Sequence, residues 1–87
     1  MNENKTRDAV LRALITVAPE VDAGAIDPAA ELQPTLDIDS LDFLNFVIAL
    51  KEDTGIEIPE GDYAEISTLN GCVAYLMKAM ATATGPS

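Results

Sequence analysis

Apolar residues recur at helical spacing in three stretches of the chain, and no stretch alternates with the period of two typical of a half-buried strand. The first stretch covers residues 6–18, where the apolar positions are 10, 11, 14, 15 and 18, and Pro19 closes it. The last begins at Ser67 or Thr68 and continues to about Ala81, with apolar residues at 69, 73, 76 and 80 on one face. The pattern predicts an all-helical domain.

The middle stretch predicts a helix that begins at Asp39 or Ser40 and ends near Thr54. Asp39 is a good N-cap, because its carboxylate can accept a hydrogen bond from the free N–H groups of the first turn. Gly55 can adopt the left-handed conformation that commonly ends a helix. We therefore expect this helix to be capped at both ends.

This middle helix carries two apolar faces. At about 100° per residue, the face expected to join the core consists of Phe43, Phe46, Val47 and Leu50. The opposite face, called the apolar strip below, consists of Leu41, Leu44 and Ile48 and is flanked by Asn45, Lys51 and Glu52. A surface helix gains little from a second apolar face unless another element or a partner covers it. Because the chain has few other elements, we favour a partner.

Residues 19–38 lack sustained periodicity and contain three prolines and a glycine, so they predict a long loop. Such a loop must be fixed to the core of a small domain, and the available apolar anchors are Val21, Ile26, Leu32 and Leu36. A short helical turn is expected at residues 61–66. The predicted fold is all-α: a small four-helix bundle of three main helices and one short helix, with the long loop between the first and second helices.

The 87 residues are expected to form a single domain, with a core spanning about residues 6–81 and a flexible tail at 82–87. The expected interior comprises Leu11, Leu14, Ile15, Phe43, Phe46, Val47, Leu50, Leu69, Val73 and Leu76.

Charge is distributed unevenly along the chain. The net charge is −10, and residues 20–65 contain thirteen acids and a single base, Lys51. Such a surface repels nucleic acid and anionic membranes and attracts basic protein surfaces. No apolar run reaches the roughly 18 residues of a membrane span, and the one cysteine fits a reducing compartment. We expect a cytoplasmic monomer that binds neither nucleic acid nor, in any stable way, membranes.

The sequence contains no evident set of catalytic residues. Ser40 cannot act as a hydrolytic nucleophile without a base, and the chain contains no histidine. Lys51 lies eleven residues further along the same helix. Asp37 and Asp39 lie in a short polar segment, where capping and solvation are simpler roles than acid–base catalysis. We predict that the chain has no catalytic residues of its own.

A metal site is equally poorly supported. The stretch "DIDSLD" begins like an EF-hand loop, but that pattern requires an oxygen ligand at Leu41 and a glycine at Asp42. Cys72 lies inside the last helix without a neighbouring ligand, so a packed thiol is expected there. We predict no metal.

The position of Ser40 suggests a different use. Free N–H groups and the partial positive charge at a helix N-terminus favour a phosphate ester on a hydroxyl there. Serine is also a common N-cap, so Ser40 could be purely structural. However, Asp39 is available as the cap, which would leave the serine hydroxyl free.

Residues 39–59, "DSLDFLNFVIALKEDTGIEIP", closely resemble the prosthetic-group segment of acyl carrier proteins, whose signature is Asp-Ser-Leu at the head of the second helix. The resemblance extends over nearly the whole chain, from the first helix through the long loop to the final helix opened by "STLNGCVAYL".

This resemblance implies that Ser40 receives 4′-phosphopantetheine from coenzyme A through a phosphodiester, installed by a separate phosphopantetheinyl transferase. The thiol of the group would then carry acyl chains as thioesters to acyl-loading and acyl-processing enzymes with basic docking surfaces. Asp39 and Asp42 match the family's acidic positions beside the serine, and Leu41 matches the leucine that seats partners. The expected docking residues are Leu41, Asp42, Leu44, Asn45, Ile48 and Glu52.

Two positions depart from the family pattern. Members that serve fatty acid synthases usually have acids where this chain has Asn45 and Lys51. Peptidyl carriers of nonribosomal synthetases typically have glycines before the serine, whereas "LDID" precedes it here. We therefore expect a freestanding acyl carrier for fatty acid, polyketide or specialised acyl metabolism. The alternative is an acidic helical interaction module without a prosthetic group.

Overall fold

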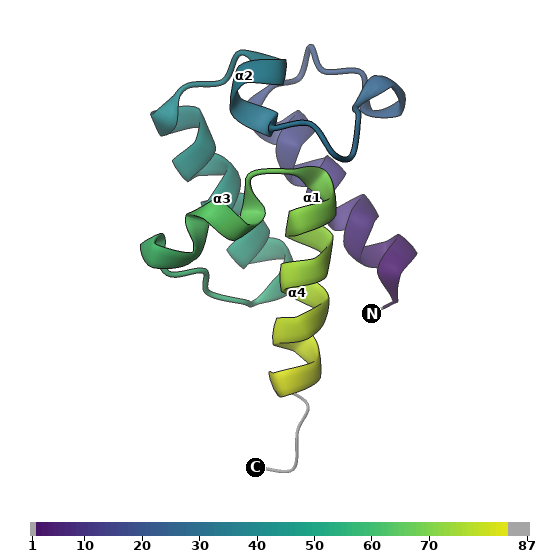
Figure 1. The fold of residues 1–87 in the computed structure, drawn as a ribbon, viewed down its shortest axis with the longest axis vertical. Helices are drawn as coiled ribbons and strands as arrows, with labels where there is room; N and C mark the ends of the chain where they lie inside the picture. Colours follow the sequence, from purple (N-terminus) through teal and green to yellow (C-terminus); the bar gives the residue numbers. More distant parts are fainter. Residues whose placement is uncertain (1, 84–87) are drawn as a thin grey trace.

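The computed structural model describes residues 2–83, and this part of the chain is helical with no strand (Figure 1). The elements are α1 (Glu3–Val17), the 3-10 helix η1 (Ala23–Ala25), α2 (Leu32–Leu36), α3 (Ser40–Thr54), the 3-10 helix η2 (Glu60–Ile66) and α4 (Leu69–Ala83). The predicted bundle of three main helices and one short helix is confirmed by α1, α3, α4 and η2.

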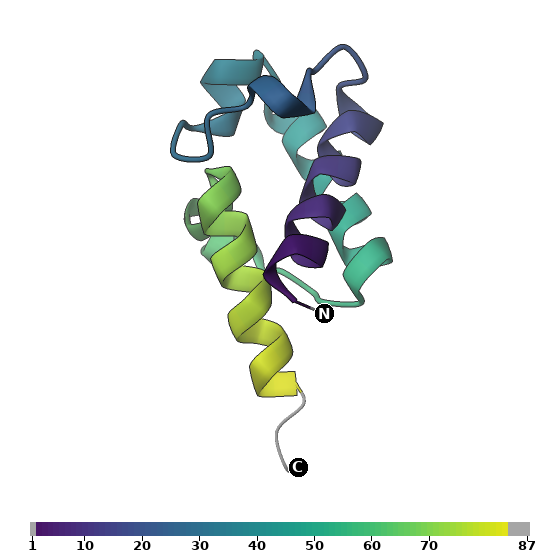
Figure 2. The same cartoon turned by 90° about the vertical axis from the view of Figure 1, so that its right-hand side faces the viewer.

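The three long helices pack with α1 between the other two. α1 contacts α3 along one side and α4 along another, while η2 packs on α4. Both views show the chain between α1 and α3 crossing one end of the bundle, above the start of α4 (Figures 1 and 2). The beginning of α3, and with it Ser40, therefore lies at the end of the bundle that this segment crosses.

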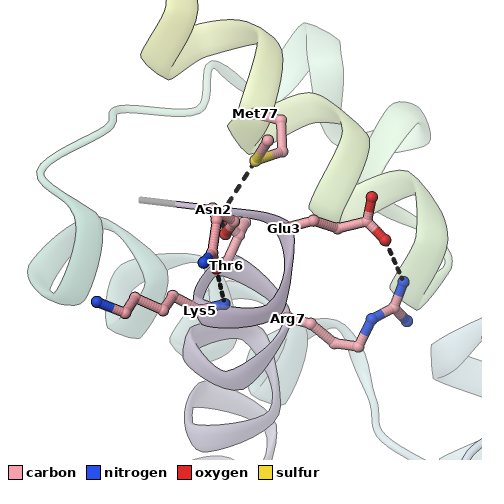
Figure 3. Close-up of polar contacts among 6 residues, drawn as sticks. All are labelled: Asn2, Glu3, Lys5, Thr6, Arg7 and Met77. Atoms are coloured by element: carbon pink, nitrogen blue, oxygen red, sulfur yellow. Dashed lines mark hydrogen bonds and ion pairs between the residues drawn. The ribbon is translucent and has the colours of Figure 1, made fainter.

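The start of α1 is fixed both locally and across the bundle (Figure 3). The Asn2 side chain accepts a hydrogen bond from the Lys5 N–H at 2.9 Å, so Asn2 is the N-cap. Thr6 is fully buried, and its hydroxyl donates to the Asn2 carbonyl oxygen at 2.8 Å and lies 3.4 Å from Sδ of Met77 on α4. The helix therefore begins three residues before the predicted Thr6.

Of the ten residues predicted for the interior, eight are buried, one is partly buried and one is exposed. Leu14, the inner face of α3 and the α4 residues are buried as expected, and Leu11 is partly buried. Ile15 was expected inside but is 40% exposed. The buried face of α1 also contains Ala9 and Ala13, whose small side chains allow a neighbouring helix to approach closely. The buried face of α1 therefore does not include Ile15, which lies at the surface.

The long loop predicted for residues 19–38 contains two short helices, η1 and α2, and so is only partly irregular. Leu32 is fully buried, whereas the other proposed anchors Val21, Ile26 and Leu36 are partly buried. The Leu32 N–H donates to the Ser67 carbonyl oxygen at 2.8 Å, which joins α2 to the start of α4. The segment is therefore attached to the bundle by a backbone hydrogen bond as well as by apolar packing.

The last helix differs slightly from the expected range. It begins at Leu69, one or two residues after the predicted start, and continues to Ala83. Residues 82 and 83 therefore belong to α4 and not to the tail expected at 82–87, and the remaining residues of that tail, 84–87, lie outside the described part of the chain.

Candidate functional site

Ser40 is the first residue of α3, and its side chain is exposed. Asp39 is the N-cap: its carboxylate accepts a hydrogen bond from the Asp42 N–H at 2.8 Å. Within residues 2–83, the Ser40 hydroxyl and the N–H groups of Ser40 and Leu41 have no hydrogen-bond partner. The predicted division of roles is confirmed in the geometry, since Asp39 caps the helix and the serine hydroxyl is free.

The turn before Ser40 is set by one left-handed residue and one buried residue. Asp37 ends α2 with φ 54°, the positive-φ region that asparagine and aspartate tolerate better than most residues. Ile38 then enters the core, and its N–H donates to the Gln33 carbonyl oxygen at 3.1 Å. Because Ile38 holds the chain from the inside, the next two residues, Asp39 and Ser40, are directed outward.

The apolar strip lies on the outer face of α3, directly after the serine. Leu41 is 64% exposed, Leu44 42% and Ile48 47%. The opposite face of the same helix is buried in the core through Phe43, Phe46, Val47 and Leu50. The exposure predicted for the strip is confirmed.

The charges around the strip differ between its two ends. At the Ser40 end, Asp39 and Asp42 take part in no ion pair within the described residues. At the far end, the Lys51 ammonium lies 3.4 Å from the Glu57 carboxylate. The sequence did not predict Glu57 as the partner of Lys51, because Glu57 lies beyond the end of α3, where helical periodicity gives no information.

A second ion pair joins α1 to the far end of α3. The Arg12 guanidinium donates to the Asp53 carboxylate at 3.0 Å. On the outer face, Asn45 and Glu52 are exposed and have no side-chain hydrogen bond or ion pair within residues 2–83. The predicted docking residues therefore share one face of α3, apart from Asp42, which is only partly exposed at its edge.

Cys72 lies in α4 and not on this face of α3, and its thiol is buried. The side chain is fully buried, and its S–H donates to the Ile66 carbonyl oxygen at 3.2 Å. Burial raises the pKa of the Cys72 thiol to about 12. In addition, the described residues contain no group of three side chains suited to hold a metal ion. The prediction of a packed thiol at Cys72 is confirmed.

Comparison with known proteins decides the family. The profile of the family described as the phosphopantetheine attachment site matches residues 9–76, which include the whole of α3. The chain belongs to the acyl carrier protein family. The acyl carrier protein of Helicobacter hepaticus is 35% identical over 66 residues, covering 76% of this chain and 87% of that protein.

Two further relatives are also named as acyl carrier proteins. The acyl carrier protein of Helicobacter pylori is also 35% identical over 66 residues, covering 76% of this chain and 85% of the relative. Acyl carrier protein 2, mitochondrial, of Arabidopsis thaliana is 30% identical over 76 residues, covering 87% of this chain and 60% of that protein.

The prosthetic group of this carrier is covalently attached 4′-phosphopantetheine. The start of α3 fits that group, because an exposed, unpartnered hydroxyl lies beside free N–H groups at the positive end of a helix. Across residues 2–83, no helix combines the length and the apolar character that crossing a membrane demands.

Proposed function

We propose that Ser40 is the residue to which 4′-phosphopantetheine is attached, and that the chain acts as an acyl carrier. The observation that carries the proposal is the free, exposed Ser40 hydroxyl at the start of α3, with Asp39 occupied as the cap. The hydroxyl needs no base within this chain, because a separate phosphopantetheinyl transferase supplies the base.

The attachment reaction is a phosphoryl transfer. The Ser40 oxygen forms a bond to the pantetheine-linked phosphorus of coenzyme A, the bond to the departing adenosine 3′,5′-bisphosphate breaks, and the serine proton passes to the transferase. When bound, the group supplies a thiol that holds acyl chains as thioesters. This chain contributes the exposed oxygen and the rigid helix start that holds it. It performs no catalysis itself.

The apolar strip is proposed as the surface on which partner enzymes dock. Its exposed side chains, Leu41, Leu44 and Ile48, would supply the contact area, while Asp42 and Glu52 would orient a partner with basic residues. Asn45, between the two acids, would add an uncharged polar contact. The strip begins one residue after Ser40, so a docked enzyme would lie next to the attachment point.

The competing function is an acidic interaction module that carries no prosthetic group. An acyl-loading experiment separates the two. Incubating the purified chain with a broad-range transferase and a short acyl-coenzyme A should add one acyl-phosphopantetheine, measured by intact mass. Neutral hydroxylamine should then remove only the acyl part, since it cleaves thioesters and leaves the phosphodiester.

An unchanged mass, under conditions that convert a control carrier completely, would reject the carrier function and favour the interaction module. Addition of a mass that hydroxylamine does not alter would reject thioester loading.

A further inference from the structure

Resting on the proposed docking surface, we propose that Lys51 is a specificity-determining residue. It favours partners whose binding groove is bordered by basic residues next to Ser40 and Glu52 and by an acidic residue next to Lys51. This charged border of the partner's groove is called the rim below. It disfavours partners whose rim is basic throughout.

The first step is the placement of Lys51 on α3. At about 100° per residue, Lys51 lies two turns after Leu44 on nearly the same line, and Glu52 lies one turn after Ile48. Lys51 and Glu52 therefore flank the far end of the apolar strip on its two edges. Opposite charges therefore lie on the two edges of the strip at this end.

The second step is the contact that Lys51 makes. Its ammonium pairs with Glu57 at 3.4 Å, while 55% of the Lys51 side chain and 79% of the Glu57 side chain remain exposed. Exposed ion pairs contribute little to stability, so this pair does not explain the lysine by folding. The pair brings the ammonium beside Glu57 and leaves most of the lysine side chain exposed to a partner.

The third step compares the two ends of the strip. Asp39 and Asp42 at the Ser40 end have no basic neighbour in an ion pair within the described residues. At the far end, Lys51 pairs with Glu57, which leaves Glu52 as the acid without an ion pair on that part of the face. The negative charge of the docking face is therefore concentrated near Ser40.

A partner whose rim carries both basic and acidic residues matches this arrangement in only one orientation. A base beside Ser40 meets two acids, a base on the other edge meets Glu52, and a carboxylate meets Lys51. Turning the partner end over end would place like charges together, which is unfavourable. The charge pattern thus selects the partner and also fixes its direction along α3.

The test uses a phosphopantetheinyl transferase whose carrier-binding face is basic throughout, with coenzyme A as donor. The rate constant kcat/KM is measured for the wild type, Lys51→Glu, Lys51→Gln and Glu57→Gln. Lys5→Glu is the matched control, because it changes the net charge by the same amount on the exposed first turn of α1. Urea melts verify that each variant is folded.

At low ionic strength we expect Lys51→Glu to raise kcat/KM roughly five- to tenfold, chiefly through KM, and Lys51→Gln to raise it roughly two- to threefold. Glu57→Gln should lower it, because Lys51 then loses its neutralising partner. Lys5→Glu should change it less than about twofold, and all differences should shrink at about 0.5 M salt.

Equal rates for the wild type and both Lys51 variants, or an equal gain in Lys5→Glu, would overturn the role of Lys51 while leaving the carrier function intact. If no variant gains mass, the carrier function itself fails, and this inference fails with it.

Discussion

At the scale of single residues, two neighbours at the start of α3 have different roles. Asp39 accepts the Asp42 N–H and completes the helix, while the adjacent Ser40 hydroxyl makes no hydrogen bond within residues 2–83. The sequence could predict this division, because capping depends on side-chain type and on a spacing of three residues along the chain. Glu57, the partner of Lys51, could not be predicted in the same way, since it lies past the left-handed turn at Gly55.

Stability measurements should show the two roles separately. Asp39→Ala should lower the free energy of unfolding by about 1 kcal/mol, because the Asp42 N–H loses its acceptor. Ser40→Ala should change it by no more than about 0.5 kcal/mol, because no hydrogen bond is lost. Urea denaturation of both variants in the unmodified protein provides the comparison. The reverse order would identify Ser40 as the structural residue.

Cys72 should be inert in the folded protein. With its pKa raised to about 12 by burial, the thiolate fraction at pH 8 is roughly 10³-fold below that of an ordinary cysteine of pKa 9.0. A thiol reagent such as Ellman's reagent should therefore label only the pantetheine thiol of the modified protein, and the unmodified protein should react only when unfolded. Fast labelling of the folded, unmodified protein would contradict this.

The same raised pKa sets the direction of the pH dependence. The unfolded thiol loses its proton near pH 9, whereas the folded thiol keeps it to about pH 12. The unfolded state therefore binds fewer protons in this window, and stability contributed by the buried neutral thiol is lost as the pH rises through it. Unfolding midpoints should fall less steeply above pH 9 in Cys72→Ala than in the wild type.

At the scale of elements, the spacing of apolar residues predicted where the long helices lie. It predicted less well how α1 is oriented in the bundle and missed the short α2. The two faces of α3 follow from residue spacing alone, and the structure confirms both. The orientation of α1 was harder to predict, because Ala9 and Ala13 contribute close packing that an apolar pattern of large residues does not reveal, and Ile15 is left exposed. The short α2 was missed because five residues, one of them Pro34, provide too few turns for a periodic signal.

The two faces of α3 should respond differently to truncation. Phe46→Ala should cost about 3 kcal/mol or more in unfolding free energy, because Phe46 is fully buried. Leu44→Ala should cost about 0.5 kcal/mol, because that side chain is 42% exposed, yet it should slow modification by the transferase. Denaturation and modification rates measured on both variants test this. An equally large loss of stability in Leu44→Ala would make the strip part of the core.

Gly71 tests the packing of α4 against the end of η2. A Cβ at this position would collide with the Glu65 carbonyl oxygen and crowd the Thr68 hydroxyl. Gly71→Ala should therefore destabilise the protein by about 1–3 kcal/mol, although alanine favours helices. Gly61→Ala is the matched control, because open space surrounds that position, and it should be nearly neutral. Thermal melts of the two variants should differ clearly.

At the scale of the whole molecule, composition indicated an acidic protein, but the arrangement of its charges is a property of the fold. Arg12 and Asp53 are 41 residues apart in sequence and form an ion pair. Thr6 and Met77, from α1 and α4, meet across 71 residues. No local pattern predicts such pairs. By contrast, the charges around the apolar strip lie on α3 itself, and only the pairing of Lys51 with Glu57 required the structure.

The central claim, that Ser40 carries the prosthetic group, is tested most directly by intact mass after incubation with coenzyme A and a broad-range transferase. The wild type and Ser67→Ala should each gain one phosphopantetheine, whereas Ser40→Ala should gain none while remaining folded. Ser67 is a suitable control because it is a serine at the end of η2, just before α4. Modification of Ser40→Ala, or loss of modification in Ser67→Ala alone, would contradict the assignment.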